Sequence, residues 1–283
     1  MPELPDLFYT ERYLRKNVTG RVIESVSVRQ PVVIRSAMEE PFQQSLPGRR
    51  ISGVAVHGPF LRMELSGEAA LIIHLMLAGR IQHQRKGERS IGHHCFSLRL
   101  EDETVLHLAD EKKMAKAYLI PAGGEQGIPR YTGLGIGILS PSFTWESFRD
   151  LAPGHRRKQV RVFINDQTIL SAIGNAYADE ILFDAGIHPK TFLGALSDGE
   201  LERLYHSILA VMHRGIRYVQ QSGQPIHVKV RDHMQVRNRK GKPCPRCSTT
   251  IRREGVRGYD VFFCPRCQPA TRKVFIDWRT ALR

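Results

Sequence analysis

Four cysteines near the end of the chain constrain its fold more than any other feature. Cys244 and Cys247 form one Cys-Pro-Arg-Cys motif, and Cys264 and Cys267 form a second one after sixteen intervening residues. Two such motifs at this separation supply four thiolates for a tetrahedral Zn²⁺ site, which leaves no position open for a water ligand. A pair of disulfides is the alternative, but a reducing cytosol disfavours it. The spacing therefore predicts one structural zinc ion, which stabilises a hairpin too small to fold unaided.

The basic charge of the chain is concentrated in the same region. The 283 residues include 42 Lys+Arg and 28 Asp+Glu, and residues 221–283 alone hold 15 and 4 of these. This segment therefore carries a net charge of +11, whereas the other 220 residues carry +3. A basic end on a near-neutral body indicates a polyanionic partner, although a solvated basic surface without a ligand is the competing reading. A membrane surface fits less well, because the basic residues do not form an amphipathic helix.

The composition is that of a globular protein. Hydrophobic residues make up 41% of the chain and charged residues 25%, which permits a packed core and excludes wholesale disorder. No run approaches the roughly 18 apolar residues that a membrane span needs. The acidic start, Met1-Pro2-Glu3, does not have the pattern of a secretory signal. We therefore expect a cytoplasmic monomer with no membrane partner.

The first half of the chain has the pattern of one helix followed by an antiparallel sandwich. Residues 4–16 read as the helix, with Pro5 in its first turn and Asn17 and Gly20 as stop signals. Short alternating or apolar runs follow at regular spacing, separated by Gly, Pro and charged turns. The expected strands are 21–28, 50–56, 61–65, 70–75, 95–100, 104–108 and 117–120.

Beyond a glycine-rich stretch the pattern becomes helical. Apolar residues recur near the 3.6-residue period, and Ser197 with Glu200 has the spacing of a capping box before the last helix. The expected helices are 145–151, 158–165, 176–185 and 201–221.

Three separated motifs, the start Pro2-Glu3-Leu4-Pro5-Asp6, the segment 166–189 and the four-cysteine finger, resemble those of one family, the formamidopyrimidine-DNA glycosylases with their endonuclease VIII relatives. The start Pro2-Glu3-Leu4-Pro5-Asp6 resembles the family's N-terminus. The segment 166–189, which contains Ser-Ala-Ile-Gly-Asn-Ala-Tyr-Ala-Asp-Glu-Ile-Leu-Phe, resembles its helix–two-turn–helix element. The four-cysteine finger also stands in the expected C-terminal place. The order and spacing agree over essentially the whole chain, so the chain is identified as a diverged member of this family.

The resemblance implies an α+β fold in three domains. An N-terminal catalytic β-sandwich domain is expected at 1–130, followed by a linker at 131–144. A helix–two-turn–helix domain is expected at 145–225, and a C-terminal zinc finger at 226–283. The resemblance also implies association with the nucleoid and with double-stranded DNA that is damaged or abasic.

The resemblance implies that Pro2 is the nucleophile and Glu3 the proton-transfer group. Removal of Met1 would expose a secondary amine, and an α-amino group titrates near ~8, so it is more often neutral than a lysine. Attack on the deoxyribose would expel the base and leave an imine, which activates the sugar for β-elimination. A Met-Pro start alone is usually inert, and Asp6 is expected to cap the first helix.

The resemblance also assigns contacts with DNA. Asn175, at the turn before a helix, is expected to bind phosphate, and the alternative that it only caps this helix is compatible. Lys158 and Arg161 are expected to add charge from the preceding helix. Leu77 is expected to fill the gap left by a flipped base, with a core position as the equal alternative. Lys112 and Met114 stand where the family has arginine and phenylalanine.

Two positions depart from the family pattern. Pro59 stands where the family has a phosphate-gripping lysine, and proline has neither charge nor backbone donor. Before the second Cys-Pro-Arg-Cys motif, Arg257-Gly258-Tyr259 replaces the family's Gly-Arg. We expect that Arg257 supplies the charge from one residue earlier or that Tyr259 stacks on a base.

The leading hypothesis is a base-excision DNA glycosylase with AP-lyase activity. A non-catalytic, zinc-stabilised damaged-DNA-binding protein is the alternative: Pro2 and Glu3 favour the enzyme, whereas Pro59 and Tyr259 favour the binder. An RNA-binding zinc-ribbon protein would explain the basic tail but neither the N-terminus nor the segment 166–189.

Overall fold

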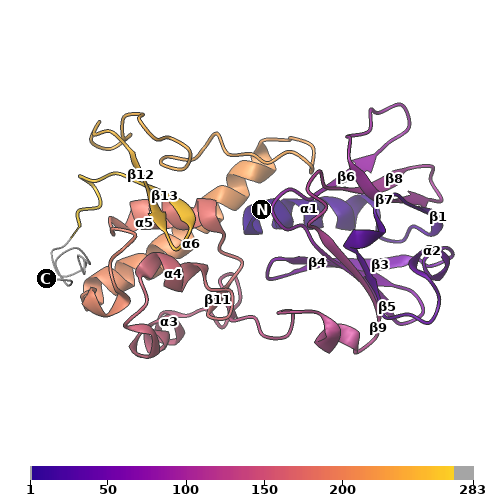
Figure 1. Ribbon diagram of the computed structural model, residues 1–283, viewed down its shortest axis with the longest axis horizontal. Coiled ribbons are helices and arrows are strands. Elements are labelled where there is room, and N and C mark those ends of the chain that lie inside the picture. The colour runs from indigo at the N-terminus through magenta and orange to yellow at the C-terminus, as the bar shows by residue number, and fades with distance from the viewer. Residues whose placement is uncertain (1, 271–283) are drawn as a thin grey trace, which may run out of the picture. The chain divides into compact units, whose positions relative to one another are not determined.

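The computed structural model describes residues 2–270, and these fall into two compact units. Unit 1 contains residues 2–133 and 216–230, and unit 2 contains residues 134–215 and 231–270. Figure 1 shows the sheets in the N-terminal half of the chain and most of the helices in the C-terminal half. The fold is therefore α+β, with an antiparallel sandwich first and helices after it, as the sequence predicts.

Helix α1, Leu4–Asn17, opens unit 1 and has sequence signals at both ends. Glu3 is the N-cap and forms a capping box with Asp6, whose Oδ2 accepts the Glu3 N–H at 2.7 Å. Leu7 and Leu14 lie on its buried face and pack into the core of the unit. The capping box confirms that Asp6 caps this helix, and it fixes the direction in which the chain enters it.

Two sheets form the sandwich of unit 1. The five-stranded sheet has the order β2-β9-β5-β4-β3, and its central strand β5 is apolar and almost entirely buried. All its pairings are antiparallel except β2 with β9. The four-stranded sheet has the order β1-β7-β8-β6 and is antiparallel throughout. The strands of unit 1 are β1 Ile23–Val28, β2 Ile34–Ser36, β3 Ile51–His57, β4 Phe60–Leu65, β5 Ala69–His74, β6 Arg80–Gln84, β7 His94–Leu100, β8 Val105–Ala109 and β9 Lys116–Pro121, and the short helix α2 is Phe42–Ser45.

Unit 2 is built on four helices and two small strand pairs. Helix α6 begins at the predicted capping box, because Ser197 Oγ accepts the Glu200 N–H and the Glu200 carboxylate accepts the Ser197 N–H. It continues through Gln221, so its last residues belong to unit 1. The elements are β10 Ile136–Gly137, α3 Trp145–Leu151, α4 Val160–Asn165, β11 Leu170–Ser171, α5 Asn175–Ala185, α6 Asp198–Gln221, β12 Arg252–Val256 and β13 Tyr259–Phe263.

The structure changes three details of the predicted outline. Strand β10 lies inside the predicted linker 131–144 and pairs in parallel with β11. Helix α4 begins at Val160, so Lys158 precedes the helix on which the sequence placed it. The sequence did not predict strands β2, β6 and β11 or the short helix α2. Within residues 2–270, no helix is long and apolar enough to cross a membrane.

Candidate functional site

The proposed nucleophile and its acid lie at the start of α1. Pro2 is buried and Glu3 is 5% exposed, and both belong to unit 1. The capping box with Asp6 orients Glu3, and the positive end of the helix dipole favours a negative charge there. A carboxylate held beside an N-terminal amine, with little access to water, can move protons to and from it.

His74 at the end of β5 organises the loop that follows it, a role for which the sequence pattern contains no direct signal. Burial, with the Arg130 charge as a second cause, lowers the pKa of His74 to about 4, so the imidazole is neutral near pH 7. Its Nδ1 accepts the Met76 N–H at 3.1 Å, and its ring packs edge-on against Phe60 at 4.9 Å. A neutral imidazole is required for this bond, because a protonated one has no acceptor.

The loop after β5 is a tight turn that presents Leu77. Met76 has a positive φ of 48°, and a Cβ at Gly79 would lie 2.4 Å from the Leu75 carbonyl oxygen. Leu77 is 49% exposed, so it does not belong to the core, and its carbonyl oxygen accepts a bond from Lys229 Nζ at 2.9 Å. The turn therefore holds an apolar side chain outward in a defined position.

The loop between β8 and β9 is held by one buried carboxylate. Asp110 is 2% exposed and accepts the N–H groups of Lys112, Met114 and Ala115 at 3.0, 2.8 and 2.7 Å. The side chain of Lys112 is exposed and that of Met114 is partly buried. Asp110 thus holds the backbone of the two residues that the sequence predicts to contact DNA.

The turn that contains Pro59 carries no charge of its own. Arg62 on β4 cannot replace the missing lysine, because it binds both Glu64 and Glu125. These carboxylates and Tyr131 raise the pKa of Arg62. Tyr131 lies against the turn, since its carbonyl accepts a bond from His57 Nε2 at 2.9 Å and its ring contacts Phe60.

Asn175 begins α5 in unit 2, at the end of the two-turn segment. Its Oδ1 accepts bonds from Arg161 Nη2 and from Asn165 Nδ2, each at 2.9 Å. These donors occupy the oxygen and leave the amide NH₂ as the group able to donate to an anion. The N–H groups of the first helical turn add to this donor site.

Arg161 does not offer its charge to solvent. It is 3% exposed, and its Nε donates to Asp179 at 3.1 Å. The prediction that Arg161 adds charge for DNA binding stays a prediction, and the structure shows this guanidinium buried and paired with a carboxylate. Arg161 instead positions Asn175, whereas Lys158 is partly exposed and paired with Asp166 at 2.6 Å.

Two buried carboxylates on α5 connect this helix to the finger. Burial raises the pKa of Asp179 to about 6, against the opposing charges of Arg161 and Arg237. Its carboxylate is paired with both arginines and accepts a hydrogen bond from Arg237 Nη1 at 2.7 Å. Glu180 accepts the N–H groups of residues 235, 236 and 237. Neither carboxylate was singled out from the sequence, although both lie within the helix–two-turn–helix motif.

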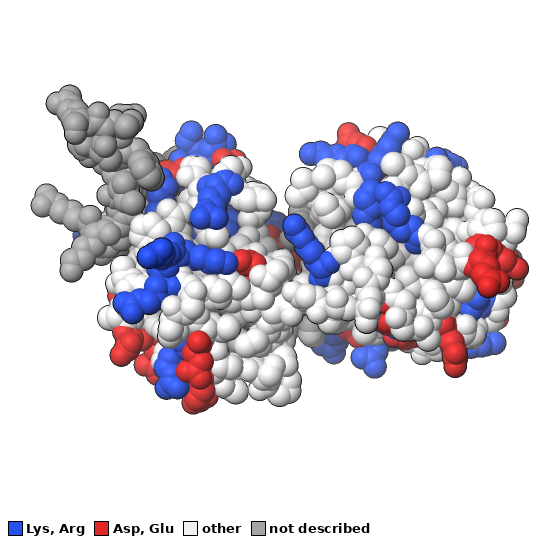
Figure 2. Space-filling model, turned by 60° about the horizontal axis from the view of Figure 1, so that its bottom comes forward, with Lys and Arg blue, Asp and Glu red and all other residues white. Residues whose placement is uncertain are grey.

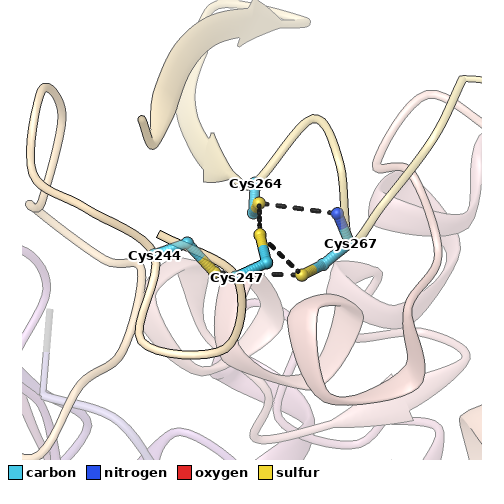
Figure 3. A group of neighbouring side chains, drawn as sticks. All are labelled: Cys244, Cys247, Cys264 and Cys267. Atoms are coloured by element: carbon cyan, nitrogen blue, oxygen red, sulfur yellow. Dashed lines mark hydrogen bonds between the residues drawn. The ribbon is translucent and has the colours of Figure 1, made fainter. Parts of the chain in front are cut away.

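The four cysteines of the finger come together as the spacing predicts (Figure 3). All are free thiols whose sulfur atoms lie within 4.8 Å of one another, and Cys244 and Cys267 are 3.8 Å apart. Four thiolates around tetrahedral Zn²⁺ at ~2.3 Å give sulfur separations of ~3.8 Å, so the donor set fits this ion. The site holds one structural zinc ion.

The hairpin that follows the first knuckle presents two polar side chains at its tip. Arg257 and Gly258 both have positive φ, 47° and 81°, which is the backbone of a two-residue hairpin turn. Arg257 is exposed and Tyr259 is 59% exposed. Buried residues of the finger pack on Phe183 of α5, so this tip is carried by the helix that begins at Asn175.

Family models match three parts of the chain. The formamidopyrimidine-DNA glycosylase N-terminal domain matches residues 1–117 and its H2TH domain matches residues 134–225. The zinc finger found in FPG and IleRS matches residues 241–270. The formamidopyrimidine-DNA glycosylases of Pelotomaculum thermopropionicum and Heliobacterium modesticaldum are 31% and 33% identical to the chain. Each match covers 95% of this chain and 99% or 100% of the relative.

Solved structures agree with this assignment over the same length. The Lactococcus lactis enzyme in complex with abasic-site DNA has a TM-score of 0.84 at 25% identity, and the MutM (Fpg) protein of Thermus thermophilus has 0.82 at 29%. Each covers 95% of this chain and 100% of the solved chain. The chain therefore belongs to the formamidopyrimidine-DNA glycosylase family and is a DNA glycosylase of base excision repair.

Proposed function

We propose that this glycosylase also cleaves abasic sites, with the amine of Pro2 as nucleophile and Glu3 as its proton-transfer group. The observation that carries the proposal is the burial of Glu3 at 5% exposure beside Pro2, where the capping box with Asp6 orients it. The amine forms a bond to C1′ of the deoxyribose while the bond to the base breaks. The resulting imine withdraws electrons from the sugar, and loss of the C2′ proton expels the 3′ phosphate. Glu3 moves protons in both steps.

The substrate in this proposal is damaged or abasic double-stranded DNA. The solved Lactococcus lactis complexes contain abasic-site DNA and Fapy-dG DNA, which supports this substrate class for a chain of the same family. The basic charge fits, since Figure 2 shows lysine and arginine side chains over both parts of the face it draws. Association with the nucleoid follows from this substrate.

Asn175 is the proposed phosphate ligand, and Arg161 and Asn165 position it. Both bind Asn175 Oδ1, which turns the amide donor away from them. Lys158, Arg257 and Tyr259 are proposed as outer contacts, because all three are at least partly exposed. Leu77 and Met114 are proposed to occupy the space that a flipped nucleotide leaves, since apolar wedges stabilise an unstacked step. Lys112, which is exposed, is proposed to contact the DNA beside them.

Arg130 is the proposed cation beside the turn that has lost its lysine. It is exposed, and its charge lowers the pKa of His74. Its neighbour Tyr131 is fixed to His57 and Phe60 on either side of Pro59. An arginine here supplies a positive charge to a phosphate near the reacting sugar, where a charge-assisted bond is strongest.

Borohydride trapping on an abasic-site duplex tests the proposal. An enzyme that forms an imine becomes covalently linked to the DNA when the imine is reduced, whereas a protein that only binds damaged DNA does not. A protein that binds this duplex with high affinity and yields no covalent product would contradict the lyase mechanism.

A further inference from the structure

A groove of about 580 Å³ lies along one side of α1 in unit 1. Its size is in the range of small-ligand sites. At 1.5 Å per residue, Arg12 and Lys16 lie roughly 13 and 20 Å along the helix from Glu3, so the groove is separate from the helix start. It is lined by Tyr9, Arg12, Tyr13, Lys16, Asn17, Arg85 and Gln220, which we call the α1 groove.

The α1 groove has an excess of positive charge that the protein does not neutralise. Among residues 2–270, the side chains of Arg12, Lys16 and Arg85 form no ion pair. Two neighbours outside the groove differ in this respect: Arg15 binds Glu11 and Lys86 binds Glu103. Glu88 lies beside one of these cations, because its carboxylate accepts the backbone N–H of Arg85 at 3.0 Å, and it thus offsets part of one charge. An anion in the groove would meet at least two cations free to bind it.

Two tyrosines of the groove are fixed by bonds at their hydroxyl ends. The Tyr9 hydroxyl donates to the Gln224 carbonyl at 2.9 Å, and the Tyr13 hydroxyl is hydrogen-bonded to His83 Nδ1 at 3.2 Å. The hydroxyl groups are therefore occupied within the protein, and both tyrosines, each partly buried, are among the residues that line the groove. Flat rings beside cations are the combination that binds unpaired bases together with their phosphates.

We propose that the α1 groove binds a single-stranded nucleic-acid segment, as a second site apart from the one at Pro2. A duplex fits less well, because its paired bases do not expose their faces to an aromatic ring. An acidic peptide would use the three cations but would gain little from two immobilised tyrosines. The groove therefore favours single strands over both alternatives.

Binding of a labelled ten-nucleotide oligothymidylate without a lesion tests this site. The triple variant Arg12→Gln/Lys16→Gln/Arg85→Gln should raise Kd about 10-fold and reduce the log–log salt slope by about 2, at ~0.7 per phosphate contact. The matched control Arg15→Gln/Lys86→Gln/Arg99→Gln removes the same charge from unit 1 but only at ion-paired positions, and its Kd should stay within about 2-fold of wild type.

Two further variants separate this site from the lesion site and from a peptide site. Asn175→Ala should retain oligothymidylate binding, and this measurement does not depend on whether the enzyme forms an imine. Tyr13→Leu should weaken binding without changing the salt slope, because stacking releases no counterions. Equal losses in the two triple variants would overturn the proposal. It would also be overturned if polyglutamate competed as well as the oligonucleotide and Tyr13→Leu had no effect.

Discussion

Lys229 donates a hydrogen bond from its Nζ to the main-chain carbonyl oxygen of Leu77, at 2.9 Å. The bond connects the segment after α6 with the turn after β5, and both lie in unit 1. Leu77 is exposed at the tip of this turn, so its position depends on how firmly its backbone is held. Lys229 thus acts on the proposed wedge through the main chain and not through the leucine side chain.

Lys229→Met should slow base removal by about 5-fold, since removal of one hydrogen bond of about 1 kcal/mol loosens the turn. Single-turnover excision from a damaged duplex measures this rate. Lys86→Met, which removes an equally positive side chain that is paired with Glu103, serves as the control. An unchanged rate in Lys229→Met would show that the bond does not position Leu77.

The neutral state of His74 predicts a pH dependence of stability. Its pKa falls from 6.5 to about 4 on folding, so the unfolded chain binds more protons between these values. The contribution of neutral His74 to the free energy of unfolding is complete above pH 6.5. It is lost as the pH falls towards 4, by up to about 3 kcal/mol at ~1.4 kcal/mol per pKa unit. Denaturant unfolding at pH 7 and pH 4.5 should therefore show a smaller pH effect in His74→Gln than in wild type. If wild type and His74→Gln showed identical pH effects, protonation of His74 would not change the free energy of unfolding.

Arg130→Gln should lower the rate of excision by about 10-fold, if a charge-assisted contact worth about 1.4 kcal/mol is lost in the transition state. Pro59→Lys in the same background should restore part of the rate, because it returns a cation to the turn. Arg35→Gln, an exposed arginine bonded to backbone carbonyls, is the control. If Pro59→Lys restored none of the excision rate, this result would argue against a phosphate near the turn.

Removal of zinc should unfold the finger while unit 1 stays folded. Four thiolates hold the knuckles, and the hydrophobic cluster around Phe183 depends on them. A chelator should therefore weaken duplex binding and abolish hydrogen-exchange protection at 244–268 but not in β4 and β5. Zinc that exchanged a bound water ligand would contradict a closed four-thiolate site.

Among the strands of five or more residues in unit 1, the sequence predicted those that alternate or are apolar, but not β6. Arg80–Gln84 reads as polar, and Gln82 and His83 are nevertheless 4% and 7% exposed. Gln82 is buried because its amide bonds to the backbone of Arg89 and Ile91, beyond the alternating pattern of the strand itself. Local pattern therefore could not predict this strand.

Site residues that belong to a recognisable motif could be predicted. Those whose role depends on a bonding partner elsewhere in the chain could not. The metal ligands follow from spacing alone. Arg161 was assigned to DNA because the sequence did not reveal its partner Asp179, 18 residues away. Asp110 and His74 were missed because each acts by accepting backbone N–H groups, which leaves no pattern in the sequence.

The central claim is that the Pro2 amine forms the imine, and peptide mapping of the borohydride-trapped complex tests it most directly. The DNA-derived mass should lie on the N-terminal peptide at Pro2 of protein that has lost Met1. A variant that retains an N-terminal extension should bind the duplex with nearly the same affinity and trap none of it. Adduct formation at a lysine, or undiminished trapping by the extended variant, would contradict the account.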